Sequence, residues 1–166
     1  MPQGSVLSCI LFKIFFSDIV SDLECGGFLY ADDLKVQKTG SLPEIDSVLD
    51  AVQRDITRVS AFCTRWGLEV HNGKTKLVAF TRSSKVRTAI QDRILYFKGL
   101  PLKYVSLSKY LGVVFDRKAN FDADFERRFK KFTRAIRQLK RLAGTQWGCP
   151  TALLLRLYRT TALPCL

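Results

Sequence analysis

Apolar residues recur every three or four positions in three long stretches of this sequence, and this spacing predicts three amphipathic helices. The first helix is expected to begin after Ser5, a favourable N-cap residue, and to end near Leu23. The second begins around Pro43, and the third covers 121–142, where Phe, Ile and Leu form the apolar stripe. A final helix is expected to begin at Pro150. The apolar face of each helix needs a second layer to cover it.

Residues 75–116 have a different texture, because short runs of β-branched and aromatic residues alternate with turn residues. These runs cover 76–81, 94–98, 102–105 and 110–115. They predict a small antiparallel sheet packed on the helices, and therefore an α+β fold. In the third helix, we expect the aromatic stripe to lie in the core and the Lys and Arg residues to face outward.

Two adjacent aspartates, Asp32 and Asp33, lie between two apolar runs and are expected at the tip of a β-hairpin. Like charges this close repel each other unless a cation lies between them. Carboxylate oxygens suit Mg²⁺ or Mn²⁺, and these ions also bridge substrate phosphates. Asp-Asp is also common turn chemistry, so the pair alone leaves a structural interpretation open.

The charge of the chain, +12 in total, is divided unevenly along its length. Residues 1–73 carry 6 Lys/Arg and 10 Asp/Glu, whereas residues 74–166 carry 21 and 5. A slightly acidic half joined to a strongly basic half predicts an acidic cation-binding site next to a basic surface that binds a polyanion. A solvated basic surface is the alternative, but the size of the asymmetry favours nucleic acid as the partner.

The cysteines and the apolar N-terminal run indicate an intracellular protein, in the cytoplasm, the nucleus or both. The five cysteines are widely scattered and the chain has one histidine, so reduced thiols are expected and no zinc site is predicted. Residues 6–20 are apolar, but Lys13 and Asp18 interrupt them and no cleavage site follows. The run is also shorter than a membrane span, so no membrane partner is expected.

Four motifs in this chain resemble those of one enzyme family. Phe28-Leu29-Tyr30-Ala31-Asp32-Asp33 resembles the F/Y-x-D-D box of reverse transcriptases, in the form usual for non-LTR retrotransposons and group II intron enzymes. The segment 2–8 resembles the P-Q-G-S-x-L-S box, and 66–75 resembles the W-x-L…K-T box. The segment 109–113 resembles the K-Y-L-G box. Order and spacing are most similar to those of non-LTR retrotransposon reverse transcriptases.

This resemblance implies an RNA-directed DNA polymerase, a nucleotidyltransferase that uses two Mg²⁺ or Mn²⁺ ions. Its partners would be an RNA template, a DNA primer and deoxynucleotide triphosphates. It further implies that residues 1–116 form part of the polymerase palm, with its catalytic hairpin. Residues 117–166 would be the basic helical start of the thumb, truncated at its C-terminus.

The family boxes also imply roles for individual residues. Asp32 would be the stronger metal ligand and Asp33 the weaker one. Lys74 would protonate the leaving pyrophosphate, or act purely as a charge clamp. The residues expected at the nucleotide are Gln3, Gly4, Tyr30 and Ala31. The residues expected to contact the primer or other nucleic acid are Lys109, Tyr110, Gly112, Arg127, Lys130, Lys131 and Arg134.

The chain departs from the family pattern at two places. It has His71 where the family usually has Asn, followed by Asn72, and whether Asn72 compensates stays open. The family's other metal-binding aspartate belongs upstream of Pro2, with the fingers. We therefore expect a fragment that is inactive alone and needs the preceding palm and fingers of its parent. Two alternatives stay open: a non-catalytic basic remnant that only binds nucleic acid, and an RNA splicing factor resembling intron maturases.

Overall fold

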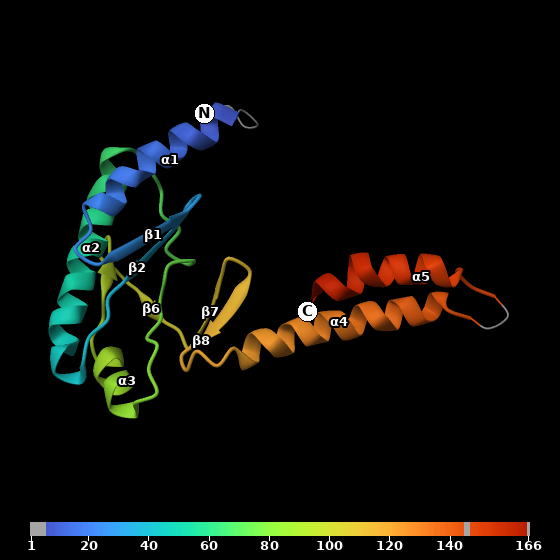
Figure 1. Cartoon of the computed structure of the whole chain (residues 1–166). Helices are drawn as coiled ribbons and strands as arrows, with labels where there is room; N and C mark the ends of the chain where they lie inside the picture. The colour runs from blue at the N-terminus through green and yellow to red at the C-terminus, as the bar shows by residue number, and fades with distance from the viewer. Residues whose placement is uncertain (1–5, 145–146, 166) are drawn as a thin grey trace. The chain divides into compact units, whose positions relative to one another are not determined.

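The structure, a computed structural model, describes residues 6–144 and 147–165 of the chain, although not the side chain of Val6 (Figure 1). The chain divides into two compact units, Met1–Val105 and Ser106–Leu166. Helices and short two-stranded ladders together make the fold α+β, as predicted. The assignment of palm and thumb stays a prediction.

The first unit contains three helices and most of the strands. In chain order they are α1 (Val6–Ser21), β1 (Gly26–Tyr30), β2 (Asp33–Gln37), the 3₁₀ turn η1 (Leu42–Glu44), α2 (Ile45–Arg65), β3 (Lys76–Leu77), α3 (Ser84–Gln91), β4 (Tyr96–Phe97), β5 (Leu100–Pro101) and β6 (Lys103–Tyr104). The helices expected after Ser5 and around Pro43 are confirmed as α1 and as η1 with α2. The sequence patterns did not predict α3.

The second unit is a hairpin of strands followed by a hairpin of helices. Its elements are β7 (Leu107–Tyr110), β8 (Val113–Asp116), α4 (Asp122–Leu142), α5 (Thr151–Leu157), the π-helical turn η2 (Tyr158–Ala162) and the 3₁₀ turn η3 (Leu163–Cys165). The two predicted helices of this region are confirmed, because α5, η2 and η3 continue one another.

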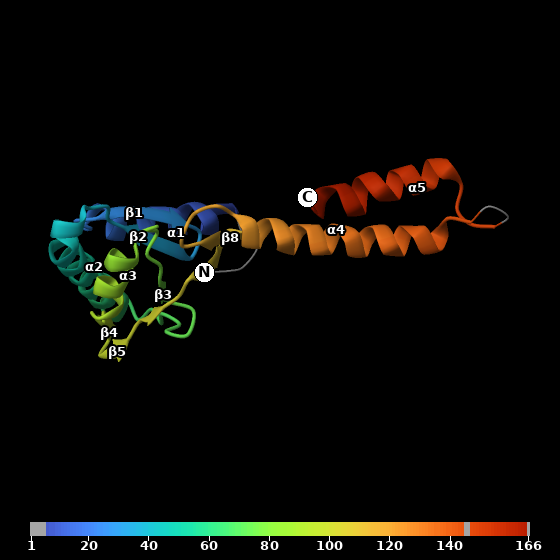
Figure 2. The same ribbon diagram turned by 90° about the horizontal axis from the view of Figure 1, so that it is seen from below.

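The strands form four separate ladders of two strands each among the described residues. Figure 2 shows β1 beside β2 and β4 beside β5. Strands β1–β2, β4–β5 and β7–β8 pair antiparallel, whereas β3 and β6 pair parallel over two residues. The predicted single antiparallel sheet is therefore wrong. The apolar runs at 76–81, 94–98 and 102–105 contain only two ladder residues each, and each of these short strands pairs with one neighbour.

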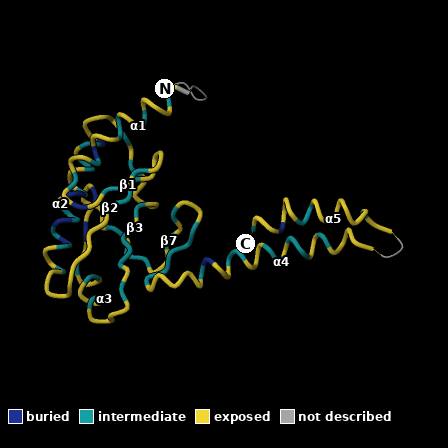
Figure 3. The backbone as a smooth tube through the Cα atoms, viewed as in Figure 1, coloured by how far each residue is buried: buried dark blue, intermediate teal, exposed yellow. Residues whose placement is uncertain are grey.

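Helix α2 is the core helix of the first unit. The carboxylate of Glu44 accepts hydrogen bonds from the backbone N–H and the hydroxyl of Ser41, at 2.8 and 2.7 Å, and so caps the turn that leads into α2. Leu49 and Cys63 are buried on its apolar face. Figure 3 shows buried stretches along α2. Trp66, at its C-terminal end, meets Phe15 of α1 edge to face at 5.0 Å between ring centroids. Aromatic packing thus joins α1 to α2.

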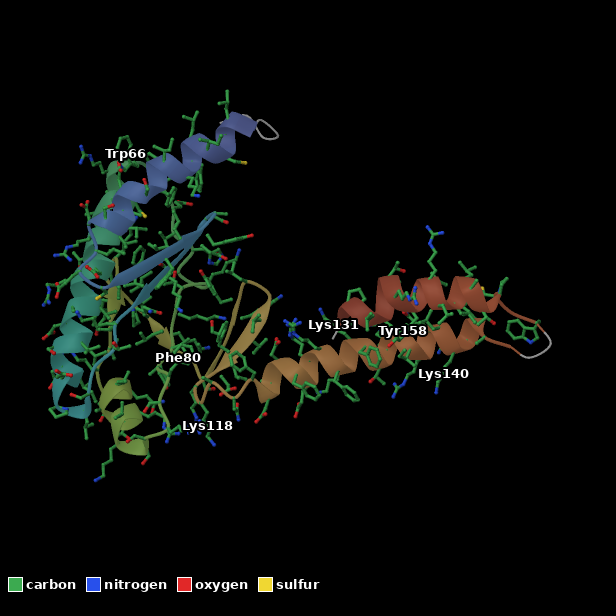
Figure 4. All side chains as sticks on the ribbon, in the orientation of Figure 1. Trp66, Phe80, Lys118, Lys131, Lys140 and Tyr158 are labelled. Atoms are coloured by element: carbon green, nitrogen blue, oxygen red, sulfur yellow. The ribbon has the colours of Figure 1, made fainter. Side chains whose placement is uncertain are left out.

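The helical hairpin of the second unit corrects one expectation. Helix α4 packs against η2 and η3, and Tyr158 lies between α4 and the returning helix (Figure 4). However, Phe125 is 65% exposed and Phe129 is 51% exposed, and the two rings stack at 5.9 Å. The aromatic stripe of α4 is therefore not wholly core, because the returning helix of α5, η2 and η3 leaves these two rings uncovered.

Along the described ranges, 6–144 and 147–165, no helix is both long and apolar enough to cross a bilayer.

Candidate active site

The β1–β2 hairpin carries Asp32 and Asp33 at its tip, as predicted. Strand residues pair from Gly26 opposite Gln37 to Tyr30 opposite Asp33, so that Ala31 and Asp32 form a two-residue turn. Ala31 has a positive φ of 51°, and a positive φ at this place is common to the turns that match the twist of paired strands. Asp32 therefore lies in the turn itself, and Asp33 is the first residue of β2.

Both carboxylates are exposed and available to a ligand. Asp32 and Asp33 make no side-chain hydrogen bond or ion pair with any residue that the structure describes. Two adjacent groups of hard oxygen donors fit the chemistry of Mg²⁺ or Mn²⁺. Within the described part of the chain, no group of three or more His, Cys, Asp or Glu residues could hold a metal ion. The hairpin thus offers two carboxylate ligands.

The strand before the turn alternates between a covered and an exposed face. Gly27 faces α1, where an added Cβ would meet Leu23 at 2.8 Å and Val20 at 3.0 Å, so the absence of a side chain permits this close packing. Phe28 and Tyr30 alternate with it and are 51% and 63% exposed. The hairpin therefore presents an aromatic, open face beside its acidic tip.

Lys74 lies in a turn between α2 and β3. The carbonyl of His71 accepts hydrogen bonds from the backbone N–H of Lys74 at 2.9 Å and of Thr75 at 3.2 Å. Lys74 is exposed, and in the described structure no hydrogen bond or ion pair joins its ammonium to the hairpin tip. His71 thus shapes the turn through its backbone. Gln3 and Gly4, expected at the nucleotide, lie outside the described residues.

A second hairpin, β7–β8, carries the residues expected at the primer. Tyr110 pairs with Val113, and Leu111 and Gly112 form the turn with φ of 47° and 86°. Two successive positive φ values define a type I′ turn, which Gly favours. The strand predicted at 110–115 is wrong, because the chain turns back at Leu111 and Gly112. The apolar residues on both sides of the glycine gave no sign of this turn in the sequence. Lys109 is exposed on β7, and Tyr110 is half-buried.

A buried aspartate of α4 holds this second hairpin. Asp124 accepts a hydrogen bond from the backbone N–H of Val114 at 2.9 Å, and its carboxylate also pairs with Arg127 and Arg128 at 2.7 and 2.5 Å. The pKa of Asp124 lies far below its ordinary value. The hydrogen bond from Arg127 is the largest cause, and the hydrogen bond from the backbone N–H of Val114 is the second. Arg127 also donates to the carbonyl of Gly112, so this guanidinium supports the turn from inside the unit.

The other cations of α4 have no buried partner among the residues that the structure describes. Exposed Lys and Arg residues along the helix are Lys130, Lys131, Arg134, Arg137, Lys140 and Arg141. Figure 4 shows Lys131 and Lys140 projecting from α4. The nearest acid to any of them is Glu126, 3.8 Å from Lys130, and both of these side chains are largely exposed. This surface can take up phosphates without breaking strong ion pairs.

Replacing Gly112 with Ala is expected to destabilise the second unit by about 1–2 kcal/mol, because a side chain strains a left-handed residue. Gly99, with φ of 77° in the β4–β5 turn, is a matched control, since an added Cβ meets nothing within 4 Å at either glycine. Urea titrations followed by NMR signals of each unit measure the two costs, which should be similar. Only Gly112→Ala should weaken primer binding; equal weakening by Gly99→Ala would contradict the primer role of Gly112.

Sequence reasoning missed two buried aspartates, Asp55 of α2 and Asp124 of α4. A signal was present for Asp55. The residues four and seven positions before and after it are all apolar, so it lies inside the apolar stripe of its helix. A charged residue in such a place is rarely exposed and needs partners.

Comparison with known proteins identifies relatives. Residues 1–115 match the family described as reverse transcriptase (RNA-dependent DNA polymerase). The chain is 30% identical to the RNA-directed DNA polymerase from mobile element jockey of Drosophila funebris, over 73% of this chain and 13% of that protein. It is 27% identical to the probable RNA-directed DNA polymerase from transposon BS of Drosophila melanogaster, over 84% and 16% respectively.

A third relative is the retrovirus-related Pol polyprotein from type-1 retrotransposable element R1 2 of Nasonia vitripennis, 25% identical over 98% of this chain and 40% of that protein. The chain thus spans well under half the length of these relatives. No solved structure is significantly similar to it.

The matched region contains the acidic hairpin tip, the turn with Lys74 and the turn of the β7–β8 hairpin. The relatives are polymerases of mobile elements, which confirms the predicted likeness to non-LTR retrotransposon enzymes. With the family model covering most of its length, this chain belongs to the reverse transcriptase (RNA-dependent DNA polymerase) family.

Proposed function

We propose that this chain supplies the catalytic hairpin and the start of the thumb to an RNA-directed DNA polymerase. One observation carries the proposal: two adjacent carboxylates, exposed and without partners among the described residues, lie at a hairpin tip inside the matched region. A divalent cation bound at these two adjacent like charges would offset their mutual repulsion.

In this proposal Asp32 and Asp33 hold divalent cations beside the primer end. Bound there, Mg²⁺ or Mn²⁺ would offset the negative charge that develops on the reacting phosphate. The primer 3′-oxygen forms a bond to the α-phosphorus as the bond to the departing pyrophosphate breaks. The hydroxyl proton passes to solvent, and Lys74 gives a proton to the pyrophosphate or clamps its charge.

The remaining predicted residues bind rather than react. Tyr30 and Ala31 form the floor beneath the primer end, and Gln3 and Gly4 contact the nucleotide. Lys109, Tyr110 and Gly112 press on the primer backbone. Arg127 was also expected to contact nucleic acid, but its guanidinium binds Asp124 and the carbonyl of Gly112, so we assign it the support of that turn instead. Lys130, Lys131 and Arg134 contact phosphates of the template–primer duplex without reading its sequence.

The test uses an extended protein, in which this chain is joined to the upstream polymerase segment with the family's other metal-binding aspartate. We expect this extended protein to lengthen a DNA primer on an RNA template when Mg²⁺ and deoxynucleotides are present, and to stop when EDTA is added. The chain by itself is expected not to extend the primer. An extended protein that binds the duplex but never extends it would favour the non-catalytic alternative.

A further inference from the structure

The segment that enters the catalytic hairpin is tied to α2 by a buried carboxylate. Asp55, in the middle of α2, is 0% exposed. Its Oδ1 accepts a hydrogen bond from the backbone N–H of Glu24 at 3.0 Å, and its Oδ2 accepts one from the N–H of Cys25 at 2.7 Å. Figure 1 shows this segment passing beside α2 on its way to β1. Both oxygens of one carboxylate therefore hold two consecutive backbone groups.

Arginines of α2 reinforce the tie from the outside. Arg58 donates to Asp55 Oδ1 at 2.6 Å and lies 3.8 Å from Glu24. Arg54 binds both carboxylate oxygens of Glu24, at 3.0 and 2.8 Å. Burial raises the pKa of Asp55, but the hydrogen bonds from Glu24, Cys25 and Arg58 outweigh it and leave the pKa below its ordinary value. The carboxylate thus stays charged and keeps its acceptors.

The position of this tie matters because it lies directly before the catalytic hairpin. Cys25 directly precedes β1, a strand of five residues that ends at the turn with Asp32. No third strand flanks β1 or β2 in the described structure, so the ladder is not braced from its edges. Five strand residues span about 17 Å, so a tilt of about 3° at the base moves the tip by about 1 Å. Displacements of that size matter for catalysis.

We propose that Asp55 is a positioning residue of the active site: by holding residues 24 and 25, it sets where the hairpin presents Asp32 and Asp33. This inference rests on the proposed function of those two carboxylates. Asp55 itself touches no substrate, and it acts only through the backbone that leads into β1.

The first test is hydrogen exchange on the chain as it stands. Asp55→Asn keeps the size of the side chain but places an amide N–H₂ against one of the two backbone donors. We expect the amides of Cys25 and of β1 and β2 to exchange about tenfold faster, while those of α4 keep their rates. Asp46→Asn is the control for loss of a carboxylate on the same helix, since the ion pair of Asp46 in the described structure is with Arg93. Unchanged exchange in Asp55→Asn overturns the proposal.

The second test separates positioning from mere stability. In the extended protein, at a temperature where the variant is fully folded, Asp55→Asn should raise the Mg²⁺ concentration for half-maximal extension about tenfold. A smaller folded fraction would lower the maximal rate without changing that concentration. Faster exchange with an unchanged Mg²⁺ requirement would therefore make Asp55 a purely structural tie and overturn the proposal.

Two further results keep the outcome unambiguous. Arg58→Ala retains both backbone hydrogen bonds to Asp55, so it should shift exchange and Mg²⁺ requirement in the same direction by a smaller factor, and it replaces Asp55→Asn should that variant not fold. If the wild-type extended protein fails to extend primers in Mg²⁺, the proposed function is overturned and this proposal falls with it, whereas the exchange result would still report on the tie.

Discussion

Asp32→Asn in the extended protein is expected to slow primer extension on the order of 10³-fold, because losing one ligand forfeits several kcal/mol of transition-state stabilisation. Asparagine has the shape of aspartate and is equally suited to a turn, but it lacks the charge that attracts a divalent cation. Since Asp32 is exposed and has no side-chain partner among the described residues, the fold should be unaffected. Single-turnover incorporation of the first nucleotide measures the loss.

Two control variants test whether the loss of rate is specific to Asp32. Asp22→Asn removes the same charge from another exposed aspartate of the first unit and should leave the rate unchanged. Asp33→Asn should cause a smaller loss than Asp32→Asn, because the family box gives Asp33 the supporting role. If Asp32→Asn extended primers at the wild-type rate, Asp32 would not be a metal ligand of this reaction.

Binding of the chain to an RNA–DNA duplex is expected to weaken about 10³-fold between 50 and 200 mM salt. This estimate follows from about six phosphate contacts, each of which releases condensed counterions. We expect these contacts from the exposed Lys and Arg residues of α4, which include Lys130, Lys131 and Arg134. Affinity should depend little on duplex sequence, since phosphates carry no sequence information. Fluorescence anisotropy at several salt concentrations measures the slope.

A pair of double variants locates the binding surface. The double variant Lys131→Ala, Arg134→Ala should reduce the slope of the logarithm of affinity against the logarithm of salt concentration by about 2. One unit is lost for each phosphate contact removed. Arg82→Ala with Lys85→Ala removes two exposed cations from the first unit and is the charge-matched control. If the two double variants had equal effects, binding would depend only on the net charge of the chain. That result would contradict the proposed contact between α4 and the duplex.

Much of the fold could be predicted from the sequence because its longest elements have strong local patterns. The stripe from Ile45 to Trp66 and the repeat of 121–142 mark α2 and α4. The acidic hairpin was predictable because Gly26 and Gly27 separate it from the apolar run of α1 and apolar runs flank the aspartates. Local spacing decides these features, so tertiary context was not needed.

The features that could not be predicted depend on contacts between distant residues. The apolar residues around Asp55 indicate that it lies on the buried side of its helix, but they do not identify its partners. Asp55 and Arg58, three positions apart on a helix, have the spacing of an ordinary surface ion pair. Only the approach of residues 24 and 25 buries Asp55. Likewise, the reversal at Leu111 requires a positive φ that leucine rarely adopts, and the hydrogen bond from Arg127 to Gly112 supports it.

The proposed catalytic role of the β1–β2 hairpin depends above all on divalent cations binding at its tip. A titration of the chain with Mn²⁺, followed by paramagnetic broadening of backbone amide signals, tests this directly and tolerates weak binding. We predict that signals of residues 30–34 broaden first, and that the double variant Asp32→Asn, Asp33→Asn abolishes this effect. Broadening that begins at other acidic residues, such as Asp116 and Asp122, or that persists in the double variant, would contradict the account.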